Sequence, residues 1–155
     1  MVNFEEIKQK IDYGMYPSLG SGSGRIVFDL MNGYVVKVGK NRKGIVQNEA
    51  EYKISRQYQT NIIANIMAVS YDFRYLIMEK AEKVPSMFDV MSYFNARSMN
   101  EVLERYEIKV LINRFDLVAR DLERKSSWGI VQGRPVIIDY GFTKHIRSKY
   151  YGFFR

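Results

Sequence analysis

A stretch of glycine and serine between strand-like runs restricts the fold of this chain more than any other sequence feature. Residues 19–24 read Leu-Gly-Ser-Gly-Ser-Gly, and two runs rich in β-branched residues follow at Arg25–Phe28 and Tyr34–Val38. Such runs favour strands, and Asn32-Gly33 between them is a strong signal for a tight hairpin. We therefore interpret the glycine stretch as a turn that leads into antiparallel strands, although glycine and serine alone would also suit a linker.

The other segments predict an α+β domain with an antiparallel sheet. Apolar residues at helical spacing indicate helices at 3–12, 44–59 and 86–94, a helix that begins with the capping box Ser98–Glu101, and a helix around Val110–Phe115. Strands are predicted at 66–69 and 75–78, joined by a turn at 70–74, and at 129–131 and 136–138, joined by a turn at 132–135.

Composition excludes several classes of chemistry and of location. The chain has 155 residues, contains no cysteine and has one histidine, His145, so disulfides, thiolate metal sites and multi-histidine sites are excluded. No apolar run approaches the ~20 residues that a membrane helix needs. The N-terminal residues MVNFEEIKQK are acidic where a signal peptide is basic. We therefore expect one cytoplasmic domain without a membrane partner.

The charge balance points to a polyanionic partner. Lysine and arginine number 24 against 17 acidic residues, which gives a net charge of +7. Nucleotide phosphates and nucleic acid are both candidates for such a basic protein. No recognised nucleic-acid motif is present, so a nucleic-acid-binding function is the least favoured of our predictions.

Groups that suit a nucleotide and its metal occur in order along the chain. Backbone N–H groups of a glycine turn can approach phosphate oxygens, and Lys37 on the next strand can reach the same phosphates. A helix glutamate can hold that lysine, and either Glu49 or Glu51 is available. They lie two residues apart and face different sides of the helix, so only one can serve; we favour Glu51. Asp139, at the end of a strand, suits Mg²⁺.

At this point the chain resembles the protein kinase-like superfamily. Five motifs occur in the family's order, and Asp121 and Asp139 lie eighteen residues apart. The motifs are the glycine-rich loop at 19–28, the lysine strand Val35-Val36-Lys37-Val38, the strand before the hinge at 76–81, Ala119-Arg120-Asp121-Leu122 in place of His-Arg-Asp-Leu, and Ile138-Asp139-Tyr140-Gly141 in place of the Asp-Phe-Gly segment.

The resemblance implies a role for each residue. ATP would be bound by Gly20, Ser21, Gly22, Ser23, Gly24, Arg25, Val27, Lys37, Met78, Glu79 and Ala81. Among these, Met78 would lie behind adenine, and the backbone of Glu79 and Ala81 would bind its edge. Glu51 would hold Lys37, and Asp121 would orient the attacking hydroxyl. Asp139 would bind Mg²⁺ together with Ser126, although Ser127 is an alternative to Ser126.

The chain departs from the family pattern in four places. Arg25 occupies the position of the third loop glycine, where it would either touch phosphate or block it. Ala119 replaces the histidine, and a serine replaces the metal-binding asparagine. Sixteen residues follow Asp139, so we expect the large helical substrate platform of the family to be absent. The basic and aromatic tail, residues 147–155, would form an exposed apolar patch or a plug over the core.

The sequence therefore predicts a kinase-like two-lobe fold, with a small lobe at 14–80, an abbreviated large lobe at 81–155 and the N-terminal helix on the small lobe. The leading functional prediction is an ATP- and Mg²⁺-dependent phosphotransferase that acts on a protein or on itself, with a protein partner or self-association. The alternative is a pseudokinase, a regulatory binding module without catalysis, favoured by the missing asparagine and platform.

Overall fold

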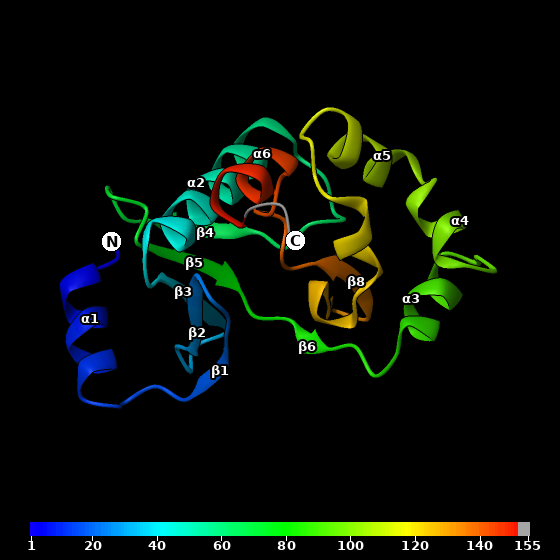
Figure 1. The fold of residues 1–155 in the computed structure, drawn as a ribbon. Helices are drawn as coiled ribbons and strands as arrows, with labels where there is room; N and C mark the ends of the chain where they lie inside the picture. The colour runs from blue at the N-terminus through cyan, green and yellow to red at the C-terminus, as the bar shows by residue number, and fades with distance from the viewer. Residues whose placement is uncertain (152–155) are drawn as a thin grey trace. The chain divides into compact units, whose positions relative to one another are not determined.

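The computed structural model describes residues 1–151, which form two compact units (Figure 1). The first unit comprises Met1–Tyr52 and Asn65–Lys80, and the second comprises Lys53–Ala64 and the residues from Ala81 onward. The predicted small lobe, 14–80, includes residues 53–64, whereas these residues belong to the second unit of the structure.

The first unit is built on an antiparallel sheet of five strands in the order β1-β2-β3-β5-β4. The strands are β1 (Ser18–Ser21), β2 (Arg25–Asp29), β3 (Tyr34–Gly39), β4 (Ile66–Val69) and β5 (Tyr75–Glu79). The predicted strands are thus present, and β1 begins inside the glycine-rich stretch. Lys37 pairs with Val27 on one side and with Leu76 on the other, so it lies on a central strand.

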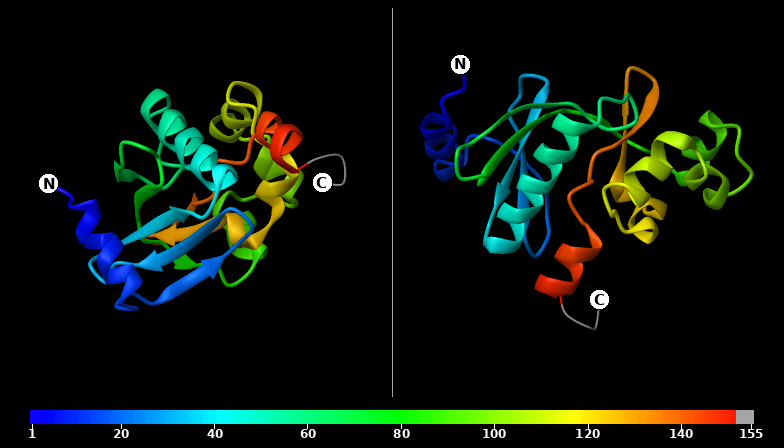
Figure 2. Two further views of the ribbon diagram at one scale, coloured as in Figure 1. Left: turned by 60° about the vertical axis from the view of Figure 1, so that its left-hand side comes forward. Right: turned by 90° about the horizontal axis from the view of Figure 1, so that it is seen from above.

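Two helices cover opposite faces of this sheet (Figure 2). Helix α1 (Phe4–Asp12) places Ile7 against Val36 and Ile77 in the apolar core of the unit. Helix α2 (Arg42–Gln57) lies on the other face, where Lys37 points, because successive residues of a strand point to opposite sides. The expected packing of the N-terminal helix on the sheet is confirmed.

The β2–β3 connection differs in detail from the predicted tight turn. It spans four residues, 30–33, and positive φ angles occur at Met31 (61°) and Gly33 (91°). Asp29 explains the difference, because its carboxylate accepts the N–H of Met31 at 2.8 Å and an ion pair from Lys80 at 2.7 Å. This side chain draws Met31 into the left-handed conformation that a two-residue turn would have given to Asn32.

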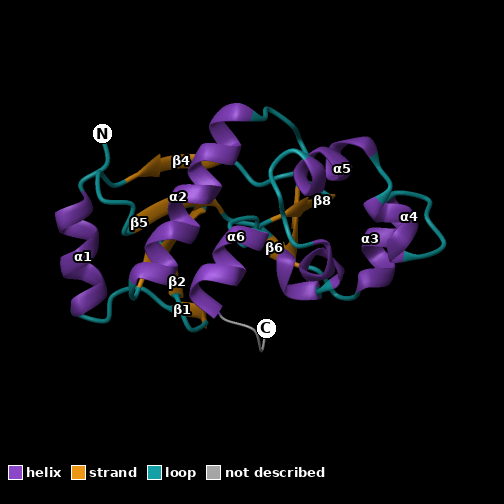
Figure 3. Cartoon of the chain, turned by 45° about the horizontal axis from the view of Figure 1, so that its top comes forward, coloured by secondary structure: helices purple, strands orange, loops and turns teal. Residues whose placement is uncertain are grey.

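The second unit combines helices with a three-stranded sheet in the order β6-β7-β8 (Figure 3). Its core contains Val90, Val102, Ile108, Leu111 and Trp128, all at most 1% exposed. The elements are β6 (Glu82–Lys83), α3 (Met87–Tyr93), α4 (Met99–Leu103), α5 (Tyr106–Asn113), the 3-10 segments Ala119–Glu123 and Lys125–Ser127, β7 (Trp128–Val131), β8 (Arg134–Ile137), α6 (Lys144–Ile146) and a π-helical turn at Arg147–Tyr151.

The β7–β8 turn is shorter than predicted. Gln132 and Gly133 both have positive φ angles, 51° and 76°, as a two-residue hairpin requires. Arg134 and Pro135 therefore belong to β8, where Pro135 pairs with Ile130. Proline is tolerated there because β8 lies at the edge of its sheet.

The segment 62–64 explains why residues 53–64 belong to the second unit. The N–H of Ile137 donates to the carbonyl of Ile62 at 2.7 Å, and the N–H of Ala64 donates to the carbonyl of Ile137 at 2.9 Å. The buried Tyr140 hydroxyl also donates to the carbonyl of Ala64, at 2.8 Å. These three bonds join the segment to β8 and to the residues that follow it.

The last described residues lie against the second unit. The Tyr151 ring contacts Phe142 edge-on, with ring centroids 5.0 Å apart. The predicted tail of 147–155 therefore has a helical, partly packed beginning, and its residues 152–155 lie outside the described residues. Within 1–151, no helix is both long and apolar enough to cross a membrane.

Candidate nucleotide and phosphotransfer site

A buried ion pair joins Lys37 to Glu51 in the first unit. The Lys37 Nζ lies 2.9 Å from Glu51 Oε1, and the two side chains are 7% and 0% exposed. Glu49, the other candidate, is only partly buried. The face of α2 that carries Ile54 therefore also carries the glutamate that meets Lys37, as the sequence analysis favoured.

Arg25 completes a three-residue ionic cluster. Its Nη1 and Nη2 donate to the two carboxylate oxygens of Glu51 at 2.9 and 3.0 Å, and Nη1 also donates to Asn48 Oδ1 at 3.0 Å. The Arg25 side chain is 9% exposed. The structure thus directs this guanidinium to the helix glutamate, a partner that differs from both readings of Arg25 in the sequence analysis.

The two cations determine the protonation of Glu51. Burial opposes the charged carboxylate, but the Arg25 and Lys37 charges and their hydrogen bonds outweigh burial and lower the pKa of Glu51 from 4.5 to about 2. The carboxylate is therefore ionised throughout the neutral and mildly acidic range.

This shift predicts a dependence of stability on acid. Because the folded pKa is below the unfolded one, the stabilisation is complete above about pH 5 and is lost as pH falls from 4.5 toward 2. The expected loss is about 3 kcal/mol in the free energy of unfolding. Urea titrations between pH 7 and pH 2.5 measure it. In Glu51→Gln this component should be absent, and an equal acid dependence in that variant would contradict the prediction.

The glycine-rich loop is closed by its own backbone and held by two side chains. The N–H of Gly22 donates to the carbonyl of Arg25 at 2.9 Å. Lys40 Nζ donates to the carbonyl of Gly22, and the Asn41 amide donates to the carbonyl of Ser23 at 2.9 Å. Gly20, Ser21, Gly22 and Ser23 are exposed. Side chains from residues 40 and 41 therefore hold the loop, and Lys40 places a positive charge beside it.

The residues predicted to contact adenine lie along β2 and β5. Val27 is directly opposite Lys37 in the sheet, and Met78 is 1% exposed within β5. The N–H of Glu79 already donates to the carbonyl of Asn65 at 2.9 Å, so Glu79 could offer a base its carbonyl rather than its N–H. Ala81 is the first residue of the second unit after β5 and contacts Gly129 closely.

Asp121 and Asp139 both belong to the second unit. Asp121 lies in the 3-10 segment Ala119–Glu123 with its side chain 20% exposed, and Asp139 is an exposed residue that follows β8. Burial raises the pKa of Asp121, the Asp139 charge raises it further, and the charges of Arg124, Arg147 and Arg120 oppose the rise. The two carboxylates are thus within electrostatic reach of each other.

Ser127, the alternative to Ser126, is the serine that is bonded to the backbone of Asp121. Ser126 is exposed, whereas Ser127 is 3% exposed and its Oγ donates to the carbonyl of Asp121 at 2.6 Å. Its own carbonyl accepts the N–H of Ile138, next to Asp139, at 2.8 Å. The 3-10 turn at 125–127 causes this arrangement, because it reverses the chain between Asp121 and β7.

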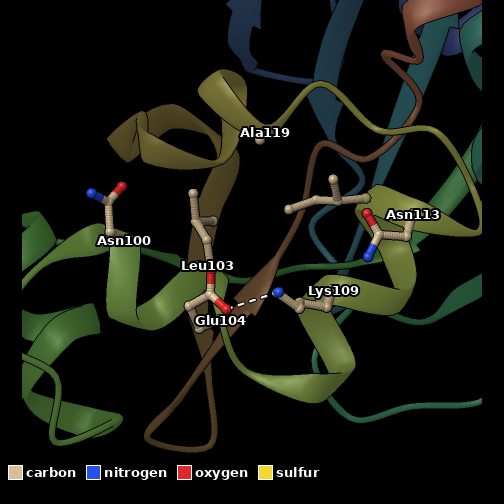
Figure 4. A pocket seen from close by; sticks show the side chains of 7 residues that line it. Asn100, Leu103, Glu104, Lys109, Asn113 and Ala119 are labelled. Carbon is tan, nitrogen blue, oxygen red and sulfur yellow. Dashed lines mark ion pairs between the residues drawn. The ribbon is translucent and has the colours of Figure 1, made fainter.

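A separate pocket of about 360 Å³ lies between α4 and α5 (Figure 4). Glu104 and Lys109 form an ion pair of 2.8 Å at its wall, and Ala119 contributes to its lining. None of the residues assigned to ATP or Mg²⁺ from the sequence lines it. It is therefore distinct from the groups described above.

Comparison with solved structures identifies the fold. The chain matches the streptomycin–ATP–APH(2″)-IIa ternary complex with a TM-score of 0.50 and 16% identity, over 91% of this chain and 72% of the other. The chain has a protein kinase-like fold. The gentamicin–APH(2″)-IIa complex (TM-score 0.50, 15% identity, 91% and 71% covered) and ADP-bound aminoglycoside phosphotransferase APH(2″)-Ib (0.50, 15%, 88% and 70%) also match. No family model and no curated protein sequence matches the chain.

Within this kinase-like fold, sequence reasoning missed Asn48 and the partner of Arg25. Asn48 is fully buried, and its amide donates to the carbonyls of Lys37, Phe73 and Arg74 at 2.9–3.2 Å. A signal for Arg25 was present in the hairpin. Opposite residues of an antiparallel pair share a face, so Val27 shares the face of Lys37, and Arg25, two residues earlier, shares it too.

Proposed function

We propose that this protein is an ATP-dependent phosphotransferase that acts on protein hydroxyls, including its own. The observation that carries the proposal is the buried Lys37–Glu51 ion pair on the sheet that also forms the glycine-rich loop. Lys37 is buried, paired with Glu51 and placed on a central strand, so it is not a solvated surface lysine. Its position suits the binding of an anion that the loop backbone also contacts.

In this proposal the first unit binds the triphosphate. The exposed turn at 20–23 would present its backbone to an incoming phosphate, and Lys37 offers a point charge. Lys40, which contacts the loop, adds a second cation near the turn. Glu51 holds the Lys37 amine in place through a charged hydrogen bond, because its own carboxylate remains ionised at neutral pH.

The second unit would supply the acidic groups. Within residues 1–151 no three of the residue types His, Cys, Asp and Glu come together as a metal cage. Mg²⁺ usually binds to one or two carboxylates with the substrate phosphates, so Asp139 and Asp121 fit this ion, with Ser127 as a neutral neighbour. When bound, the ion would neutralise negative charge on the phosphates.

Asp121 is assigned to the acceptor hydroxyl. The hydroxyl oxygen forms a bond to the γ-phosphorus, the bond from that phosphorus to the β–γ bridging oxygen breaks, and ADP leaves. The hydroxyl proton passes to the Asp121 carboxylate. A pKa that burial raises above the ordinary range makes this carboxylate a better proton acceptor than an exposed aspartate.

The charges around Asp121 favour a protein over an aminoglycoside as acceptor. Arg120, Arg124 and Arg147 all act on Asp121, and the Arg124 guanidinium lies 3.7 Å from its carboxylate. Streptomycin and gentamicin, which are bound in two of the matching structures, are polycations and would meet like charges here. A serine or threonine hydroxyl on a protein carries no such charge.

One observation favours the alternative of a nucleotide-responsive pseudokinase. A serine, Ser126 or Ser127, stands in place of the asparagine that the family pattern expects, and the Ser127 hydroxyl donates to the Asp121 carbonyl. A single neutral oxygen is a weaker ligand for Mg²⁺ than an amide carbonyl with a carboxylate. This alternative keeps nucleotide binding and removes transfer.

A thermal-shift titration with Mg-ATP tests the proposal. A ligand at 100 times its Kd stabilises the folded state by about 2.7 kcal/mol, which raises the Tm by roughly 5–10 °C. Lys37→Ala should lose most of this shift and still fold, because Arg25 continues to neutralise Glu51. No shift in the wild type at millimolar nucleotide would exclude ATP binding. Transfer of labelled γ-phosphate then separates the phosphotransferase from the pseudokinase.

A further inference from the structure

Arg25 stands where the resemblance expects a third loop glycine, and its side chain is used inside the fold. The guanidinium binds both oxygens of Glu51, one through Nη1 at 2.9 Å and one through Nη2 at 3.0 Å. Two parallel bonds fix the plane of a carboxylate, which a single lysine contact does not do. Lys37 donates to the Oε1 oxygen of the same carboxylate at 2.9 Å.

Asn48 connects this cluster to the backbone of the sheet. Its side-chain oxygen accepts from Arg25 at 3.0 Å, and its amide donates to the carbonyl of Lys37 at 3.2 Å. The same amide reaches Phe73 and Arg74 in the β4–β5 turn. Asn48 and Glu51 lie three residues apart on one face of α2, so a single helix face holds Arg25 from two directions.

The first turn of α2 is also packed against the base of the glycine-rich loop. A methyl group on Gly44 would overlap the carbonyl oxygen of Gly24, and one on Gly39 would lie 2.9 Å from the N–H nitrogen of Ile45. Backbone therefore meets backbone here, without side chains between them. Such a contact resists sliding of the helix along the strands.

From these contacts we infer that Arg25 is a positioning residue, which holds Glu51 and, through it, the Lys37 amine in place before any nucleotide binds. The inference rests on the proposed function only in assigning that amine to the binding of ATP. It makes α2 a fixed support rather than a helix that moves into place, because ionic, amide and backbone contacts all hold the same turns. The conformational entropy of the Lys37 side chain is then lost during folding and not on binding, so ATP binds to a preorganised cation.

The test measures the reactivity of Lys37 in the nucleotide-free protein. Limited acylation with an amine-reactive ester, followed by peptide mass spectrometry, gives a modification rate for each lysine as a function of pH. In the wild type we expect Lys37 to react at least 10-fold more slowly than the exposed Lys8. In Arg25→Gln the Lys37 rate should rise at least 5-fold and its pH profile should move, because the carboxylate loses its orientation, while Lys8 remains unchanged.

Two further variants keep the test decisive. Arg25→Lys retains the charge but not the two parallel hydrogen bonds of the guanidinium, so it should fold even if Arg25→Gln does not. In this variant Lys37 should still react faster than in the wild type. Arg42→Gln, which changes an exposed arginine of the same unit, is the control and should leave Lys37 unchanged. Wild-type Lys37 rates in a folded Arg25→Lys protein would overturn the inference. Because no nucleotide is present, this result is independent of whether the protein binds ATP.

Discussion

Glu51→Ala is expected to lower the free energy of unfolding by about 3–5 kcal/mol, which is the usual effect of removing one partner from a buried ion pair. The carboxylate is fully buried and accepts from both Arg25 and Lys37. Its removal leaves two buried cations close together in place of a compensated cluster. Since a domain of this size is typically stable by about 5–15 kcal/mol, the variant should be near the limit of folding. Urea denaturation followed by circular dichroism measures the loss.

Glu49→Ala is the matched control, because it lies on the same helix two residues away and is only partly buried. Its effect should stay within about 1 kcal/mol. Glu51→Gln keeps the shape of the side chain, so its loss in free energy of unfolding should lie between those of Glu49→Ala and Glu51→Ala. If Glu49→Ala and Glu51→Ala were equally destabilised, the ionic cluster would not be the source of stability that its geometry indicates.

Asp121→Asn is expected to reduce phosphate transfer by about 10²–10⁴-fold, the usual contribution of a positioned proton acceptor. The amide keeps the size of the side chain, and the carbonyl that Ser127 binds belongs to the backbone, so the local fold should persist. The Tm and the Mg-ATP thermal shift should therefore change little. Single-turnover transfer of labelled γ-phosphate at saturating ATP gives the rate.

Asp116→Asn provides the control in the same unit. Asp116 is about half exposed, faces Lys144 at 3.9 Å, and has a φ of 62°, which asparagine also tolerates. It should transfer phosphate at the wild-type rate. Transfer by Asp121→Asn within twofold of the wild type would show that another group accepts the proton.

The sequence predicted the secondary structure well because most elements carry local signals. The strands β2, β3, β4 and β5 follow β-branched runs, and the capping serine of α4 accepts the N–H of Glu101 as its motif predicts. The errors occur where a distant group decides. Met31 takes its conformation under the influence of Asp29 and Lys80, fifty-one residues apart, which no local pattern reveals.

In the candidate site, too, residues set by local periodicity were predicted, whereas those set by distant contacts were not. The choice of Glu51 over Glu49 followed from helix periodicity, because the apolar face of α2 must meet the sheet. The spacing from Asp121 does not decide between Ser126 and Ser127, because it depends on a 3-10 turn, which advances the chain differently from an α-helix. The role of Arg25 was missed because the family motif directed attention to phosphate, whereas strand pairing places the side chain opposite α2.

The pairing of residues 62–64 with β8 has a consequence for synthesis of the chain. Ile62 and Ile63 are buried, and their strand partner lies more than seventy residues later in the sequence. On the ribosome these residues must therefore stay uncovered until residue 137 has emerged. Such late, long-range closure slows folding and leaves an apolar segment open to aggregation or to a chaperone. Truncation before residue 137 should consequently reduce solubility, because it leaves Ile62 and Ile63 without their strand partner.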